Sequence, residues 1–371
     1  MIYMTKIKNM VFILLLLVLF CEKQYAGEIF PIPKTDFNPR HYICYRTLGE
    51  INVDGKIDEA DWQNAQWTEY FVDIEGDLKP KPTYNTHVKM LWDDEYYYFA
   101  AFIEEPHVWA KLKQRDTVIY YDDDFEIFID PNSDAHEYYE YEMNAFNTVW
   151  DLLLTKPYRD NGSAIFNWDI NGLKSGVFVD GTINDASDID KGWYVEVAIP
   201  WEVLKECADR ETPPKDEDQW RVGFSRVDWK MEIVNNNYKK SINPATNRPF
   251  PESNWIWSQQ GLIAMHYPER WGIVQFSDSN VENQNSKFIE SEQYLAANYL
   301  YEIYYYQKQY FIDHGKYTKK FPKTLNESEK LIEYNWPPII EINTNSFDII
   351  LNGKKGSKDL LLNHEGKLKK I

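Results

Sequence analysis

Residues 87–130 constrain the fold most, because their bulky side chains follow one another with a spacing that suits paired strands and not a helix. Two largely apolar runs, residues 87–92 and residues 97–103, are separated by the polar, turn-forming residues 93–95. Two short runs of this kind, joined by a turn signal, predict a β-hairpin.

Residues 125–130 predict a third strand whose two faces differ. Phe125, Ile127 and Ile129 share one face, because successive side chains of a strand point to opposite sides. Glu126 lies on the other face, beside an aromatic ring. A carboxylate on the polar face of a sheet is a candidate ligand contact.

Strand-like segments with turn signals between them recur from about residue 50 to residue 278. This frequency predicts an all-β sandwich over residues 45–278, antiparallel and immunoglobulin-like or jelly-roll-like. Residues 291–315 then predict one helix that ends at Gly315, followed by two alternating segments. We expect residues 279–371 to form a C-terminal helix with a small β-hairpin, and we interpret the helix's aromatic stripe as packing and not as a binding surface.

The N-terminal residues 1–26 predict an export signal. Two lysines precede the uncharged run of residues 10–20, which is short for a bilayer span and fits the apolar core of a secretion signal. Cys21 follows this run as the lipidated cysteine of a bacterial lipoprotein does, and cleavage before Gly27 is the alternative. We expect an exported protein that is periplasmic, an outer-membrane lipoprotein or extracellular.

Composition excludes some partners and favours others. Asp and Glu number 59 against 40 Lys and Arg, and the formal net charge of −19 repels nucleic acids and anionic membrane surfaces. The 27 tyrosines and 14 tryptophans exceed what a core needs, and aromatic faces stack on sugars. Beyond Cys21 only Cys44 and Cys207 remain, so at most one disulfide can form and the fold must depend mainly on its core.

Five segments of the chain form a recognisable series: INVDGKIDEADW (residues 51–62), VKMLWDDEYYYFAAFIEEP (88–106), YDDDFEIFIDP (121–131), GWYVEVAIPWEVL (192–204) and WRVGFSRVDW (220–229). In this order they resemble carbohydrate-binding module family 9. The later residues 254–277 are similar to the form of this module in exported proteins of polysaccharide-degrading bacteria. The resemblance implies a β-sandwich that binds a poly- or oligosaccharide between two aromatic side chains without transforming it, in support of polysaccharide catabolism.

The resemblance also implies which residues contact the sugar. Tyr120 corresponds to one stacking aromatic, and Glu126 corresponds to the strand carboxylate that accepts bonds from sugar hydroxyls. Glu142, followed by Asn144, replaces an arginine of the family pattern, so the recognised hydroxyl pattern should differ. The second aromatic falls in a loop with three candidates for the missing face, which are Trp257, His266 and Tyr267.

Structural roles are the alternatives for several of these residues. Tyr120 could be an ordinary surface tyrosine, and Glu126 could contact a buried arginine such as Arg226. Trp150 fits either a core or a ligand position. Four other tryptophans are expected in the core, because each lies in an apolar strand or turn pattern: Trp62, Trp92, Trp193 and Trp201.

The run Asp122, Asp123 and Asp124 suggests a structural calcium ion, which the resemblance also implies, since hard oxygen ligands suit calcium. A solvated loop is the alternative, because adjacent residues of a strand point to opposite faces. We expect no catalytic metal and no other cofactor.

Two further function classes remain open. Glu126 and Glu142 on neighbouring strands could serve a glycoside hydrolase acting on O-glycosyl bonds, although no other catalytic signature is present. A related sandwich fold ligates haem through methionine and histidine. The side chains available for haem ligation are Met90, Met143, Met265 and His266.

Overall fold

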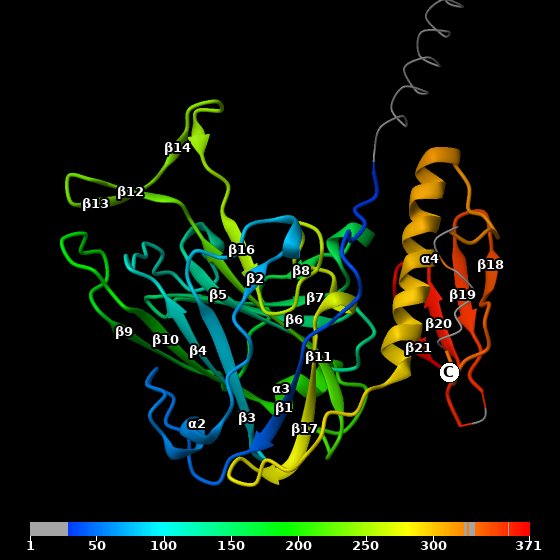
Figure 1. The fold of residues 1–371 in the computed structure, drawn as a ribbon, viewed down its shortest axis with the longest axis horizontal. Coiled ribbons are helices and arrows are strands. Elements are labelled where there is room, and N and C mark those ends of the chain that lie inside the picture. The colour runs from blue at the N-terminus through cyan, green and yellow to red at the C-terminus, as the bar shows by residue number, and fades with distance from the viewer. Residues whose placement is uncertain (1–28, 323–324, 326–330, 355) are drawn as a thin grey trace, which may run out of the picture. The chain divides into compact units, whose positions relative to one another are not determined.

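The computed structural model describes residues 29–322, 325, 331–354 and 356–371 (Figure 1). The predicted export signal and Cys21 lie outside these residues. The chain divides into two compact units: Pro33–Ser291, and a unit that contains Glu292–Ile371 together with residues 29–32. Among the described residues, no helix combines the length and the apolar character needed to cross a bilayer.

One β-sheet dominates Pro33–Ser291 and joins 13 of the described strands (Figure 1). Its main path is β8-β7-β6-β5-β11-β17-β1-β3-β4-β10-β9, and β16 pairs with both β11 and β2. The strands are β1 (His41–Arg46), β2 (Val72–Asp73), β3 (Thr86–Trp92), β4 (Tyr96–Glu104), β5 (Asp124–Asp130), β6 (Tyr138–Asn144), β7 (Val149–Leu154), β8 (Ala164–Ile165), β9 (Lys174–Asp180), β10 (Gly192–Pro200), β11 (Gln219–Asp228), β16 (Ser253–Ile256) and β17 (Gly272–Asn280).

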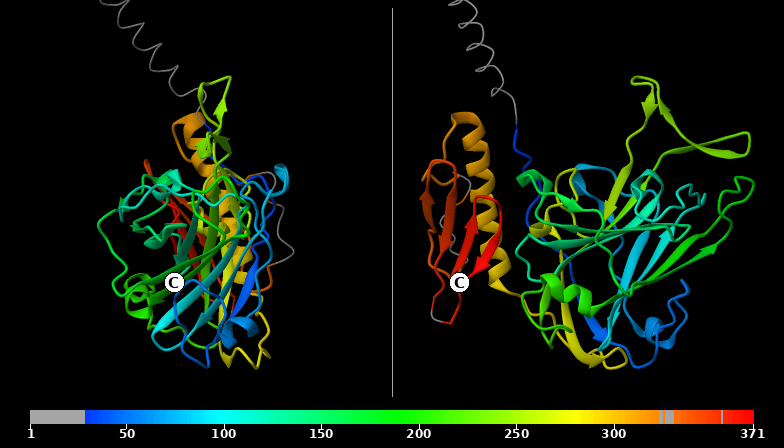
Figure 2. Two further views of the ribbon diagram at one scale, coloured as in Figure 1. Left: turned by 90° about the vertical axis from the view of Figure 1, so that its left-hand side faces the viewer. Right: turned by 180° about the vertical axis from the view of Figure 1, so that it is seen from behind.

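The sheet folds back on itself, so that its two halves cover a common core (Figure 2). Phe99 of β4 and Val197 of β10 pack in the same cluster as Ile127 of β5 and Tyr141 of β6. The predicted all-β sandwich is confirmed, and so is the burial of the four core tryptophans. The sheet is mixed and not purely antiparallel, because β1 pairs in parallel with both β17 and β3 and so joins the two halves.

The predicted hairpin is present as β3 and β4, whose pairing ends at Trp92 and Tyr97. Asp93 Oδ1 closes the turn by accepting hydrogen bonds from the backbone N–H of Glu95 and of Tyr96, both at 2.7 Å. These strands alternate poorly in sequence because both of their faces are covered. Met90 faces the main core, whereas its neighbour Leu91 packs in a second apolar cluster.

Short helices and ribbons complete Pro33–Ser291. A short helix, α3, follows Pro200, and a 3-10 turn continues it. These elements are α2 (Ala60–Asn64), α3 (Trp201–Leu204), the 3-10 turns η1 (Gly76–Leu78), η2 (Ile119–Tyr121), η3 (Tyr158–Asp160), η4 (Lys205–Cys207) and η5 (Pro268–Arg270), and the ribbons β12 (Met231–Val234) with β13 (Asn237–Lys240) and β14 (Ile242–Asn243) with β15 (Arg248–Pro249).

The second unit consists of the helix α4 (Glu292–His314) and an antiparallel sheet in the order β18-β19-β20-β21. Gly315 ends the helix as expected, with a positive φ of 65° and its N–H bonded to the carbonyl of Phe311. The hydroxyl of Tyr301 donates to the carbonyl of Gly366, so the aromatic side of the helix is core. The predicted hairpin is thus part of a larger sheet, formed by β18 (Ile339–Ile342), β19 (Phe347–Leu351), β20 (Leu360–Asn363) and β21 (Leu368–Lys370).

Candidate functional site

A pocket of about 210 Å³ lies over β5 and β6, on the side opposite the main core. We call it the β5–β6 pocket. Strand residues form its floor, and residues from the connecting loops form its rim. Its lining residues are Tyr120, Glu126, Glu140, Glu142, Trp150, Leu152, Tyr158, Val227, Glu252, Asn254, Met265 and His266.

The register of the sheet places a row of polar and aromatic side chains across three strands. Glu126 of β5 is opposite Glu142 of β6, and Glu142 is opposite Trp150 of β7. Side chains of directly opposed residues project to the same face and lie within contact of each other. Glu140 shares that face because it is two residues from Glu142. The floor of the pocket is therefore a cluster of carboxyl groups next to an indole ring.

The carboxyl groups of the floor are buried without compensating charge. Burial raises the pKa of Glu126 to about 7, and burial together with the charge of Glu126 raises the pKa values of Glu140 and Glu142 well above the usual range. The Oε2 atom of each of these three residues has no hydrogen-bond partner. Burial, followed by the charge of Arg159, lowers the pKa of His266 to about 3, so this ring is neutral. The floor thus offers carboxyl oxygens that protein atoms leave unused.

Aromatic rings surround these acceptors. Tyr120 is 36% exposed, and its backbone carbonyl accepts a hydrogen bond from Trp229 Nε1 at 2.8 Å. Trp150 is stacked on Phe166 with the ring planes 8° apart, which fixes its orientation. Tyr158 is 48% exposed, so rings on more than one side of the pocket have accessible surface.

Four of the seven predicted contact residues line this one pocket: Tyr120, Glu126, Glu142 and His266. Segments from residue 120 to residue 266 are therefore brought together as expected. The remaining three predicted residues lie elsewhere.

Trp257, Tyr267 and Asn144 have structural surroundings, which corrects their predicted place in the site. Trp257 is fully buried and packs in the main core. Tyr267 is 2% exposed and lies beneath the guanidinium of Arg159, 4.1 Å from the ring centre. Asn144 Nδ2 donates to the carbonyl of Leu112 at 2.9 Å, which holds a loop in place.

Sequence reasoning missed several lining residues. Glu140 could have been found, because it is two residues from Glu142 on the same strand and so points to the same face. Tyr158 and Glu252 lie outside the strands, in segments where no sequence periodicity indicates the direction of a side chain. The ambiguous Trp150 is resolved as a lining residue.

The aspartate run does not form one calcium site, because its three carboxylates belong to different surroundings. Asp122 Oδ2 accepts hydrogen bonds from the backbone N–H of Lys111 and of Leu112 and from the side chain of Asn144, at 2.7 to 3.0 Å. The other two aspartates each join a different group of carboxylates. Calcium binding near this run therefore stays a prediction, with Asp123 and Asp124 in two separate groups.

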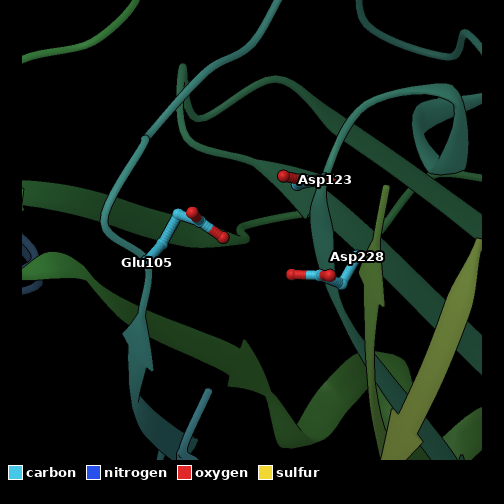
Figure 3. Close-up of side chains that lie close together, drawn as sticks. All are labelled: Glu105, Asp123 and Asp228. Atoms are coloured by element: carbon cyan, nitrogen blue, oxygen red, sulfur yellow. The ribbon is translucent and has the colours of Figure 1, made fainter. Parts of the chain in front are cut away.

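Asp123 meets Glu105 and Asp228, and Figure 3 shows these three side chains around a common space. Arg226 already supplies a positive charge there, with Nη2 at 2.6 Å from Glu105 Oε2 and 2.8 Å from Asp228 Oδ1. Arg226 therefore pairs with these residues and not with Glu126, the alternative considered from the sequence.

The four haem-ligand candidates do not gather at one place. Met90 and Met143 are fully buried in the main core and accept hydrogen bonds from tyrosine hydroxyls, whereas Met265 and His266 line the β5–β6 pocket.

Comparison with known proteins adds independent findings. A model of the family described as carbohydrate family 9 binding domain-like matches residues 53–243. Endo-1,4-beta-xylanase A of Thermoanaerobacterium saccharolyticum and exoglucanase XynX of Acetivibrio thermocellus are 29% and 28% identical to this chain over 159 residues. Each alignment covers 43% of this chain and 12% of the relative, so the chain matches a small part of those enzymes.

Family 9 carbohydrate binding modules from Caldicellulosiruptor kristjanssonii, in complex with cellotriose or with glucose, match at 15% identity. Each match covers 67% of this chain and 100% of the module, with TM-scores of 0.40 and 0.41.

Proposed function

Since the chain belongs to the carbohydrate family 9 binding domain-like family, we propose that it binds a poly- or oligosaccharide in the β5–β6 pocket without transforming it. One observation carries the proposal: buried glutamates with unused acceptor atoms lie beside accessible aromatic rings in a single cavity. A pyranose needs both features, because its hydroxyls donate hydrogen bonds and its C–H faces stack on rings.

The chemistry of the pocket fits one sugar unit. A hydrogen bond to a glutamate side chain contributes roughly 0.5–1.5 kcal/mol when the carboxyl is neutral and roughly 1.5–3 kcal/mol when it is ionised, and a ring contact adds to this binding free energy. The cavity of about 210 Å³ is smaller than the ~300–1,000 Å³ typical of drug-sized ligands. We infer that one sugar ring enters the pocket while the rest of the chain lies outside.

The proposal extends to the setting in which the protein acts. The relatives are a xylanase and an exoglucanase, which supports a role in polysaccharide catabolism. The export signal predicted from residues 1–26, with or without lipidation at Cys21, would place the protein where such polysaccharides occur.

Glycoside hydrolysis is the second candidate, because carboxylate oxygens of Glu126 and Glu142 lie within 4.8 Å of each other. That proximity resembles the ~5–5.5 Å carboxyl separation of retaining enzymes. However, such enzymes need one protonated and one ionised carboxyl group, and here burial raises the pKa values of both groups, which disfavours the ionised form of each. Binding without turnover therefore fits better.

Calorimetry with a panel of oligosaccharides, together with an assay for reducing sugars, tests the proposal. We expect heat of binding without sugar release. Tyr120→Ala should weaken affinity about threefold to tenfold through the loss of one ring contact. Tyr70→Ala is the matched control, since Tyr70 is a similarly exposed tyrosine outside the pocket. Sugar release that Glu126→Gln abolishes would favour the hydrolase instead.

A further inference from the structure

Three groups of carboxylates in the described residues have oxygen atoms within 4.8 Å of one another, and they differ in charge compensation. The group at Glu105 contains Arg226, as described above. The group of Asp116, Asp151 and Asp169 contains Arg115, whose guanidinium lies 2.5 Å from Asp151 and 3.0 Å from Asp169. The chain therefore places an arginine in two of the three groups.

The third group, Asp124, Glu126 and Glu142, has no such partner. Its members take part in no ion pair with a lysine or arginine of the described residues, and no lysine or arginine lines the β5–β6 pocket. All three are at least nine-tenths buried, and each leaves one oxygen without a hydrogen-bond partner: Asp124 Oδ2, Glu126 Oε2 and Glu142 Oε2. Glu140 and Glu252 add further carboxyl groups at the pocket.

We propose that the saccharide bound in the β5–β6 pocket carries a protonated amine, so that the ligand is an amino sugar. The inference rests on the proposed function and names the class of sugar that the pocket selects. The ligand would supply the positive charge that arginine supplies in the other two groups. This charge would lower the raised pKa values of Glu126 and Glu142, so that binding ionises them and releases protons.

The number of unused oxygen atoms matches the number of N–H donors of an ammonium group. An ammonium has three N–H donors and no acceptor, and three glutamates that line the pocket, Glu126, Glu140 and Glu142, each offer one unused oxygen. Separate hydroxyls of a neutral sugar can also donate to these oxygens, but neither a hydroxyl nor an acetamido group balances the charge of the ionised carboxylates.

The aromatic rings of the pocket favour an organic cation over a bare metal ion. Trp150, Tyr120 and Tyr158 line the same pocket, and a metal ion would make no use of their faces. A sugar ring stacked on one of these side chains can carry its amine into the carboxylate group. A cationic ligand also gains from attraction to the aromatic faces themselves.

Calorimetry with three oligosaccharides of equal length and linkage tests the inference: β-1,4-linked oligomers of glucosamine, of N-acetylglucosamine and of glucose. They differ only in the substituent at carbon 2. At pH 6 and moderate salt, we expect the glucosamine oligomer to bind at least about tenfold more tightly than the other two. Glu142→Gln should remove this preference, whereas Glu202→Gln, a change of an exposed carboxylate outside the pocket, should leave it unchanged. Melting temperatures of both variants show whether they are folded.

Each other outcome has a defined meaning. Equal or tighter binding of a neutral oligomer would overturn the inference and leave the proposed function intact. Binding that a chelator abolishes and added Ca²⁺ restores would assign the carboxylate group to a metal ion and would also overturn it. A preference that survives in Glu142→Gln would show only general attraction to an acidic protein. No binding of any oligosaccharide in a wider panel would refute the proposed function as well.

Discussion

Replacing Glu126 by glutamine should stabilise the unliganded protein at alkaline pH. Burial raises the pKa of Glu126 from 4.5 to about 7. Between these values the folded state holds a proton that the unfolded state releases, so stability falls as pH rises through this interval. The destabilisation that the ionised side chain of Glu126 causes is absent near pH 4 and complete by pH 8. At about 1.4 kcal/mol per pKa unit, it reaches roughly 3 kcal/mol.

Urea unfolding of the parent and of Glu126→Gln, at pH 4.5 and at pH 8, measures this cost. Tryptophan fluorescence reports on the correct unit, because every tryptophan except Trp336 lies in Pro33–Ser291. We expect the variant to be more stable than the parent by about 2–3 kcal/mol at pH 8 and nearly equal at pH 4.5. Glutamine keeps the size of the side chain and cannot ionise, so the difference isolates the charge.

Glu202→Gln is the control, since Glu202 is an exposed carboxylate and its replacement should change stability by less than ~0.5 kcal/mol. A Glu126→Gln variant that is less stable than the parent by the same amount at both pH values would refute the reasoning. It would mean that Glu126 is a structural carboxylate whose charge the fold already compensates. A variant that is more stable than the parent is expected if Glu126 serves binding at the expense of the stability of the protein.

Three further predictions concern residues outside the pocket. Gly272→Ala should destabilise the protein by more than ~1 kcal/mol in urea unfolding, because the new Cβ would lie 2.2 Å from the buried ring of Trp257. Glu196→Gln should cost about 1–3 kcal/mol in the same assay, since its carboxylate accepts hydrogen bonds from Trp62 Nε1 and from two backbone N–H groups, and an amide NH₂ would face a donor. Cys44 is a fully buried free thiol whose pKa burial raises, so peptide mapping should find it unmodified by a thiol reagent until urea unfolds the protein.

The sequence predicted those parts of the fold that depend on local periodicity. Alternation in residues 125–130 placed Glu126 on the face opposite the core, and the structure has it there. The same rule applied to the next strand would have added Glu140. The β3–β4 hairpin was predictable because a polar turn separates two short apolar runs.

Loop residues and distant pairs could not be predicted in this way. Trp257 and Tyr267 lie in a segment without regular alternation, so nothing in the sequence distinguished a buried ring from an exposed platform. Whether Arg226 pairs with Glu126 or with Glu105 depends on the face of β11 to which its side chain points. A shift of the strand register by one residue would turn the side chain to the other face. The three adjacent aspartates do not form a single site for a related reason. Asp123 and Asp124 are neighbours in sequence but belong to different groups of carboxylates.

A crystal structure of the protein soaked with the oligosaccharide that binds most tightly in calorimetry tests the central claim most directly. We predict electron density for one sugar ring over β5 and β6, with its polar groups within hydrogen-bond distance of Glu126 and Glu142 and one face on Tyr120 or Trp150. Density for the sugar on another surface, with the β5–β6 pocket filled only by water, would contradict the account.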